Sequence, residues 1–168
     1  MTNRSASHYP DKGVLGEDLV AQWLQSRGWI IRHRRWRCRW GEIDIIAQQG
    51  GSCPMPALAF VEVKTRSRGN WDADGLLAIT PQKRAKICQT AKCFLAAYPH
   101  LADYPCRFDV ALVSCQHLSK SQEQKLSEIL LTQESSESFP PKTFQVGQAG
   151  DLGEYQLILQ EYIPAAFD

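Results

Sequence analysis

Asp44, Glu62 and Lys64 interrupt two short apolar segments of the sequence, residues 41–45 and 60–64, which otherwise predict buried β-strands. Carboxylates and ammonium groups are seldom buried unless they are paired or bound to a metal ion. Two carboxylates and a lysine at the ends of neighbouring strands are typical of a divalent-cation site. The residue types therefore predict metal-assisted chemistry on phosphate esters.

Strand geometry predicts which of these side chains share a face of the sheet. Successive side chains of a β-strand point to opposite faces. The first segment therefore predicts Ile43 and Ile45 on one face, opposite Glu42 and Asp44. By the same rule, the acid and the lysine of the second segment share a face.

Ordinary ion pairs offer a simpler interpretation of the same residues. Glu62 and Lys64 would form a surface pair on one strand, which contributes little to stability. Asp44 and Lys64 would form an equally ordinary pair across adjacent strands. For Glu42 we expect an ion pair with one of the neighbouring arginines rather than a place in the metal site.

The elements that must position these residues follow from periodicity and from glycine and proline signals. Apolar spacing, together with Gly28 as a stop and Thr80-Pro81 as a start, predicts two helices. The expected elements in chain order are helix 16–27, strands 29–37, 42–47 and 58–65, a helix from Pro81 to before Pro99, and strands 107–114 and 155–163. This order predicts one α/β domain over residues 1–168, a mixed central sheet flanked by helices in the order αβββαβ–insertion–β. The polar insertion at 116–153 is expected to be mobile, with a short helix over 121–131.

Charge is distributed unevenly along the chain. Residues 1–107 carry 16 Lys/Arg against 9 Asp/Glu, whereas residues 108–168 carry 3 against 9. A positive surface around an acidic metal site suits a nucleic-acid substrate, although charge runs alone more often mark a solvated face. No apolar run is long enough to span a bilayer, the first twelve residues lack the apolar core of a secretory signal, and we expect no membrane partner and a cytoplasmic location. No P-loop or Gly-x-Gly-x-x-Gly motif indicates a nucleotide cofactor.

Residues 27–39 contain six arginines and no acid, with tryptophans interleaved at 29, 36 and 40. Arginine binds phosphates, and tryptophan can stack on exposed bases. The alternative is that the tryptophans pack in the core while the arginines border an edge strand, and we expect some of each. The predicted DNA-binding residues are Arg32, Arg34, Arg35, Arg37, Arg39 and Arg66.

Several spaced motifs give the sequence a resemblance to a known family. They are Gly13-x-x-Gly16-Glu17, Arg37-x-x-x-Gly41-Glu42-Ile43-Asp44, Phe60-Val61-Glu62-Val63-Lys64-Thr65-Arg66, Lys83, Arg107-Phe108-Asp109-Val110 and Tyr162-Ile163-Pro164-Ala165-Ala166-Phe167. Together they resemble the YraN family of poorly characterised bacterial proteins, over about two thirds of the chain by matched segments. The resemblance implies a restriction-endonuclease-like fold, related to that of archaeal Holliday-junction resolvases.

The resemblance also implies roles for the matched positions. Asp44 and Glu62 would bind Mg²⁺ or Mn²⁺, with the backbone carbonyl of Val63 as a further ligand, and Glu17 would reach the ion directly or through water. Lys64 would orient or help deprotonate the attacking water and offset charge on the phosphate. An acid in the position of Glu17 is also favoured by the helix dipole alone.

Two matched positions, Lys83 and Asp109, have further interpretations, and the sequence departs from the family pattern in two places. Lys83 falls on the apolar stripe of the second helix, where it would point at the scissile phosphate or extend along apolar surface to solvent. Arg35 stands where the family usually has an asparagine, and the 116–153 segment is longer than usual. Asp109 is expected to pair with a neighbouring Arg or Lys.

The leading hypothesis is therefore a metal-dependent DNA endonuclease acting on branched or otherwise distorted DNA, because no recognition helix for reading base edges is evident. The expected partner is DNA with branched, flapped or single-stranded regions. Catalytic residues would be Glu17, Asp44, Glu62, Lys64 and Lys83. A homodimer follows only from the analogy with resolvases. The alternatives are a DNA-binding module without turnover, and an adaptor of a DNA-processing complex that uses the 116–153 segment as its contact.

Overall fold

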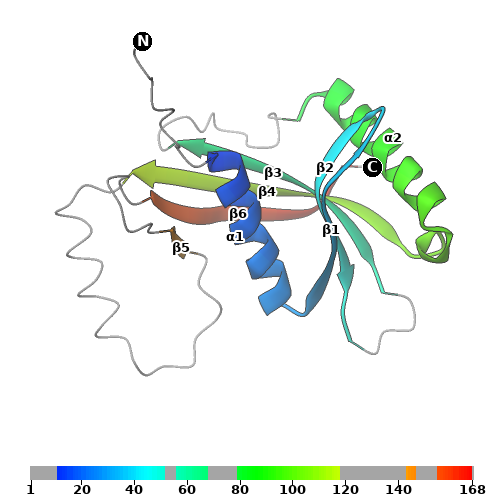
Figure 1. Cartoon of the computed structure of the whole chain (residues 1–168), viewed down its shortest axis with the longest axis horizontal. Coiled ribbons are helices and arrows are strands. Elements are labelled where there is room, and N and C mark those ends of the chain that lie inside the picture. The colour runs from blue at the N-terminus through cyan, green and yellow to red at the C-terminus, as the bar shows by residue number, and fades with distance from the viewer. Residues whose placement is uncertain (1–10, 52–55, 68–78, 118–142, 147–154, 168) are drawn as a thin grey trace, which may run out of the picture.

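The computed structural model describes residues 11–51, 56–67, 79–117, 143–146 and 155–167. Within these residues a six-stranded sheet has the order β1-β2-β3-β4-β6-β5 and carries two α-helices (Figure 1). The elements are α1 (Lys12–Ser26), β1 (Trp29–Cys38), β2 (Gly41–Gln49), β3 (Leu58–Ser67), α2 (Pro81–Ala97), the 3-10 turn η2 (Pro99–Leu101), β4 (Cys106–His117), β5 (Thr143–Val146) and β6 (Tyr155–Phe167).

The sheet is mixed because one of its pairings is parallel. β3 and β4 run parallel, joined through α2, while the pairs β1–β2, β2–β3, β4–β6 and β5–β6 are antiparallel. A parallel pair requires a crossover connection, and the segment that contains α2 supplies it. The predicted α/β class with a mixed sheet and flanking helices is confirmed, and the arrangement is compatible with a restriction-endonuclease-like fold.

The two helices start at side-chain caps. The Asp11 carboxylate accepts a hydrogen bond from the Gly13 N–H at 2.9 Å, so α1 begins one turn earlier than the predicted residue 16. α1 ends at Ser26, one residue before the predicted end at residue 27, and the predicted stop Gly28 has a φ of +82°, which suits glycine. α2 begins as predicted, with Thr80 Oγ1 accepting from the Lys83 N–H at 3.2 Å and Pro81 in the first helical position.

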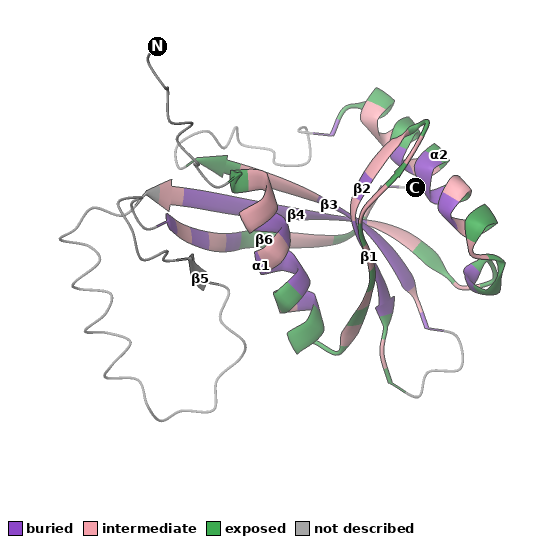
Figure 2. Cartoon of the chain, viewed as in Figure 1, coloured by how far each residue is buried: buried purple, intermediate pink, exposed green. Residues whose placement is uncertain are grey.

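Two hydrophobic clusters lie on opposite faces of the sheet. Figure 2 shows the buried residues along the central strands. On β3, Ala59 and Val61 pack in the cluster that α1 covers, while Leu58 and Phe60 pack in the cluster that α2 covers. The alternation of β3 therefore supplies both cores. Phe94 of α2 is fully buried at the centre of the second cluster.

β6 continues four residues beyond the predicted end at Ile163. It passes through Pro164 because its pairing with β4 shifts there, and Ala165 takes a φ of +47°. The Ala165 N–H donates to the Asp109 carboxylate at 2.9 Å, so a side chain replaces the backbone acceptor that the shifted ladder cannot provide. Proline at such an irregularity removes no ladder bond, which is why it did not end the strand.

The predicted 116–153 insertion is only partly described. β4 extends to His117, and β5 lies within the segment and pairs with β6. The expected helix over 121–131 falls outside the described residues. No helix of the described residues is both long and apolar enough to cross a membrane.

Candidate metal-binding active site

The candidate site lies where β2 separates from β3. The two strands pair from Gln48–Leu58 to Ile45–Val61, and there the regular register ends. Just beyond the last pair, the Val63 N–H donates to Asp44 Oδ2 at 2.7 Å. The Asp44 carboxylate thus takes the place of a backbone acceptor, and this hydrogen bond holds Asp44 against β3 beside Glu62.

The prediction that Ile43 and Ile45 share a face is wrong. Ile43 packs in the α2 cluster, whereas Ile45 packs in the α1 cluster, so alternation breaks at Asp44. The neighbouring strand turns with it, because Trp36 still pairs with Ile43 while Arg35 adopts a φ of +50°. The left-handed backbone at Arg35 and the break in alternation at Asp44 therefore lie at the same level of the β1–β2 hairpin.

Glu62 and Lys64 share a face of β3, as predicted, but Glu62 is not at the surface. Its side chain is 5% exposed, and its Oε1 lies 2.7 Å from Lys64 Nζ and 3.1 Å from Lys83 Nζ. Lys83 reaches it from the first turn of α2, across the sheet face. The other oxygen, Oε2, is buried and has no hydrogen-bond partner. A buried carboxylate oxygen without a partner is costly unless a ligand satisfies it.

The carboxyl group of Asp44 has a strongly raised pKa. Burial and the adjacent Glu62 carboxylate, with a smaller contribution from Glu17, raise the pKa of Asp44 from 3.8 to about 7, while the Val63 N–H and Lys83 oppose the shift. Two carboxylates that share a poorly hydrated site repel each other when both are ionised. A cation between them would relieve that repulsion.

Glu17 is the third predicted acid, and an arginine holds it. The carboxylate is 9% exposed at its side chain and accepts two hydrogen bonds from Arg35, at 2.7 and 3.0 Å. Among residues with described positions, no group of three or more His, Cys, Asp or Glu side chains is placed to hold a metal ion. The described site therefore offers two carboxylates, Asp44 and Glu62, and Glu17 as a direct ligand remains a prediction.

Sequence reasoning did not assign Arg35 the task of holding Glu17. Its left-handed backbone is unfavourable for arginine and is tolerated well by asparagine, the residue that the resembling family usually has there. That departure was the available signal for an unusual backbone at this position. In this chain the arginine at that position forms an ion pair with Glu17.

Close packing brings α1 to the site. Gly16 lies against Thr65 of β3, and a Cβ at Gly16 would lie closer to Thr65 Oγ1 than atoms can approach. Only glycine lets the helix come this near, and the next residue is Glu17. The short distance between the helix and β3 places the third acid close enough to Asp44 to raise its pKa.

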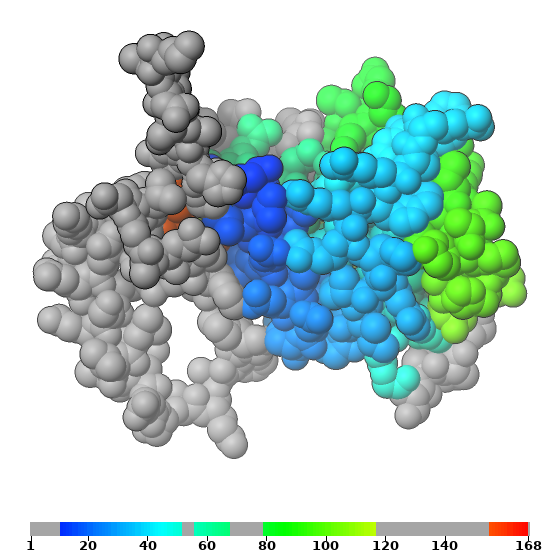
Figure 3. Space-filling view, viewed as in Figure 1, coloured from blue at the N-terminus to red at the C-terminus, as the bar shows by residue number. Residues whose placement is uncertain are grey.

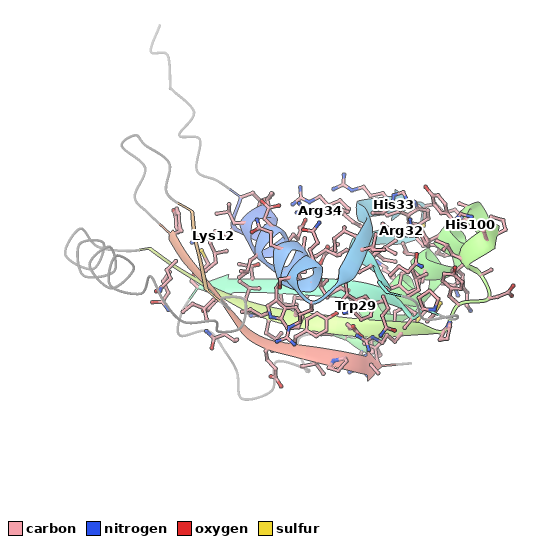
Figure 4. The ribbon with its side chains drawn as sticks, turned by 90° about the horizontal axis from the view of Figure 1, so that it is seen from below. Lys12, Trp29, Arg32, His33, Arg34 and His100 are labelled. Carbon is pink, nitrogen blue, oxygen red and sulfur yellow. The ribbon has the colours of Figure 1, made fainter. Side chains whose placement is uncertain are left out.

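The predicted DNA-binding arginines lie mainly along β1, which forms an edge of the sheet. Figure 3 shows the hairpin of β1 and β2 as a broad surface beside α1, and Figure 4 shows Arg34 next to that helix. Arg34 pairs with Asp18 at 2.6 Å, and Arg37 pairs with Glu42 at 2.8 Å, the expected partner of that acid. Three predicted positions remain. Arg32 donates a hydrogen bond to Gln48, the Arg39 guanidinium lies over the ring of Trp40, and Arg66 is exposed.

Asp109 pairs with a neighbouring arginine, as predicted, and lies on β4 opposite Val61, the residue before Glu62. Its fully buried carboxylate accepts from Arg107 Nε at 3.1 Å, from the Tyr162 hydroxyl at 2.6 Å and from the Ala165 N–H. Burial and this carboxylate raise the pKa of Tyr162 well above its usual value. These hydrogen bonds hold β6 on β4, and we call this network around Asp109 the latch.

Comparison with known proteins gives a consistent result. The profile of "Uncharacterised protein family UPF0102" matches residues 16–113, which include all five predicted catalytic positions. A UPF0102 protein of Trichormus variabilis is 57% identical over 154 residues, 92% of this chain and 92% of the relative. A UPF0102 protein of Trichodesmium erythraeum is 52% identical over 165 residues, covering 94% and 88%, and one of Synechocystis sp. is 43% identical over 160 residues, covering 94% and 97%. The resemblance to the YraN family is thereby confirmed.

Proposed function

The chain belongs to the uncharacterised protein family UPF0102, and we propose that it is a metal-dependent endonuclease that hydrolyses phosphodiester bonds in DNA. The family name assigns no activity, so the proposal depends on the site. The observation that carries it is the Glu62 carboxylate. It is almost fully buried, one oxygen lies between two lysines, and the other is free beside Asp44.

The donor set fits a hard divalent cation. Carboxylate oxygens are the ligands that Mg²⁺ and Mn²⁺ prefer, and Mg²⁺ commonly uses one or two carboxylates and fills its other positions with water and substrate phosphate. Asp44 and Glu62 would hold the ion, with the Val63 carbonyl as a further ligand. When bound, it would lower the pKa of a coordinated water and offset the charge that develops on the phosphate.

The two lysines balance the acids and face the substrate. Lys64 is 25% and Lys83 37% exposed at the side chain, so each ammonium contacts buried Glu62 and still reaches solvent. Lys64 would orient the attacking water, and Lys83 would contact the scissile phosphate from α2. An ion pair that served stability alone would require only one of them.

The surface around the site supports DNA as the substrate. Arg37 is 70% exposed at its side chain despite its pairing with Glu42, and Arg66 follows directly after the site on β3. Exposed guanidinium groups exchange such weak surface partners for phosphates readily. Arg34 would do the same at the α1 side, where its partner Asp18 is exposed. The two-bond pair of Arg35 with nearly buried Glu17 is stronger, and a bound cation and phosphate would have to replace it for Glu17 to approach the ion.

The test is cleavage of a labelled panel of duplex, single strand, flap and four-way junction with Mg²⁺, Mn²⁺ or EDTA. Wild type would cut at least one substrate only with metal. Glu62→Gln, which keeps the shape and removes the charge, would abolish cutting, and Lys64→Ala would reduce it by about 100-fold or more. Glu42→Gln is the matched control, because it removes a carboxylate from the same region outside the acidic pair, and cutting would persist.

A DNA-binding module without turnover is the second candidate. It is favoured by one observation, the pairing of Glu17 with Arg35, which leaves two rather than three acids for a metal. Binding without cutting on every substrate, unchanged by Glu62→Gln, would overturn the nuclease and support this module. Isothermal titration of Mn²⁺ into the protein supplies an independent measure, because the nuclease requires metal binding that Glu62→Gln removes.

A further inference from the structure

Trp40 differs from the other tryptophans that the structure describes. Trp23, Trp29 and Trp36 are half-buried and pack against the two hydrophobic clusters. Trp40 is 44% exposed, and Ile30 is the only other large hydrophobic side chain that is exposed among the described residues. A single exposed apolar side chain is common on a protein surface and needs no explanation by itself. What sets Trp40 apart is the set of cations around it.

The environment of Trp40 is cationic. It lies with Arg39 in the two-residue turn between β1 and β2, and the Arg39 guanidinium lies 5.1 Å from the centre of its ring. The cation–π contact holds the guanidinium at the indole, and both side chains remain exposed. Arg37, which precedes the turn on β1, is 70% exposed although it pairs with Glu42, so the turn presents an aromatic surface beside two exposed guanidinium groups.

The turn is also positioned relative to the acidic site. Gly41, which follows Trp40, lies against Thr90 in the middle of α2, the helix that carries Lys83. Asp44 lies four residue steps beyond Trp40 along the chain, which at a strand rise of about 3.3 Å per residue is roughly 13 Å. That length corresponds to about four nucleotides at the duplex rise of 3.4 Å.

We propose that Trp40 and Arg39 form a binding site for an unpaired nucleobase about four nucleotides from the scissile phosphate. The indole would stack on the base, and the guanidinium would contact its phosphate. An aromatic ring with an adjacent arginine binds single-stranded nucleic acid without reading sequence, since every base has a π-face. A base inside intact duplex cannot reach a flat ring at the tip of a hairpin. The proposal rests on the proposed DNA substrate and adds a preference for DNA with unpaired bases.

The test is fluorescence anisotropy of a labelled single strand and of the same sequence as a blunt duplex, with full-length protein in EDTA so that cleavage plays no part. Trp40→Ala would weaken single-strand binding by about 5- to 150-fold, the range for loss of one stacked base. Duplex binding would change less than about twofold, because phosphate contacts dominate it. Trp40→Phe would keep most single-strand affinity, and Ile30→Ala, at the far end of the same strand, would keep all of it.

Each other outcome has a definite meaning. Equal binding of the single strand by Trp40→Ala and wild type, or equal losses on both DNA forms, would overturn this inference and leave the nuclease proposal intact. A wild type that binds neither form would overturn this inference, and the cleavage panel with metal decides the nuclease proposal separately. If light scattering shows a wild-type dimer that Trp40→Ala converts to a monomer without loss of single-strand affinity, the turn is a contact between copies of the chain, and the inference is wrong.

Discussion

The ionisation of Asp44 should destabilise the metal-free protein, so replacement by asparagine is expected to stabilise it near neutral pH. Asparagine keeps the shape and an oxygen that can accept from the Val63 N–H, now held at 2.7 Å by Asp44 Oδ2. It removes the charge that repels Glu62. The expected cost is cation binding, so stability and the proposed activity are opposed at this position.

The magnitude and sign follow from the pKa of Asp44, raised from 3.8 to about 7 by burial and by Glu62. Below about pH 4 both the folded and the unfolded chain bind the proton, and no penalty exists. Between about pH 4 and 7 the unfolded chain loses the proton first, so stability falls by at most about 1.4 kcal/mol per pH unit. Above about pH 7 the full penalty applies, with an upper limit of about 4 kcal/mol.

The assay is urea unfolding of wild type and Asp44→Asn in EDTA at about pH 5, 6, 7 and 8. The stability advantage of the variant would grow with pH, and at about pH 8 it would raise Tm by up to roughly 8–16 °C for a domain of this size. Glu42→Gln is the control, since its exposed ion pair with Arg37 contributes within about 1 kcal/mol. An advantage that does not change between about pH 5 and 8, or a less stable variant at about pH 8, would refute the argument.

Three further predictions concern the packing that builds the site. Gly16→Ala would destabilise the fold by about 1–3 kcal/mol in chemical denaturation, because its new Cβ meets Thr65, and a neutral or stabilising effect would contradict the close approach. Arg35→Gly would be more stable than Arg35→Ala by about 1–2 kcal/mol, because the left-handed φ favours glycine. If Arg35→Ala is the more stable of the two, as is usual within a strand, the backbone at this position is not strained. Tyr162→Phe would lose about 1–3 kcal/mol of unfolding free energy by removing a donor from buried Asp109, and an unchanged Tm would show that the latch contributes nothing.

Much of the fold could be predicted because its signals are local. Gly28 and the Thr80-Pro81 pair mark helix ends through their own backbone preferences, and the segment at 58–65 alternates in a way that holds wherever it is placed. The β6 strand was predicted too short because Pro164 normally ends a strand. The side chain of Asp109, 55 residues earlier, makes the continuation possible, and no local rule contains that contact.

The candidate site divides in the same way. Its residue types were evident from the sequence, since buried acids and lysines stand out against apolar strands, and the shared face of Glu62 and Lys64 followed from a two-residue period. Tertiary structure decided which charges meet. The Lys83 ammonium reaches Glu62 only because the parallel β3–β4 pair carries α2 back across the sheet, and the Arg35 guanidinium reaches Glu17 only because α1 packs closely on β3.

The sequence by itself determined the elements, their order and the chemistry available to the chain, because propensity, capping and alternation depend on neighbours along the backbone. The tertiary structure alone decided the break in alternation between Ile43 and Ile45, and the burial that raises the pKa of Asp44. Both result from the packing of distant segments, and their energies depend on distances in space.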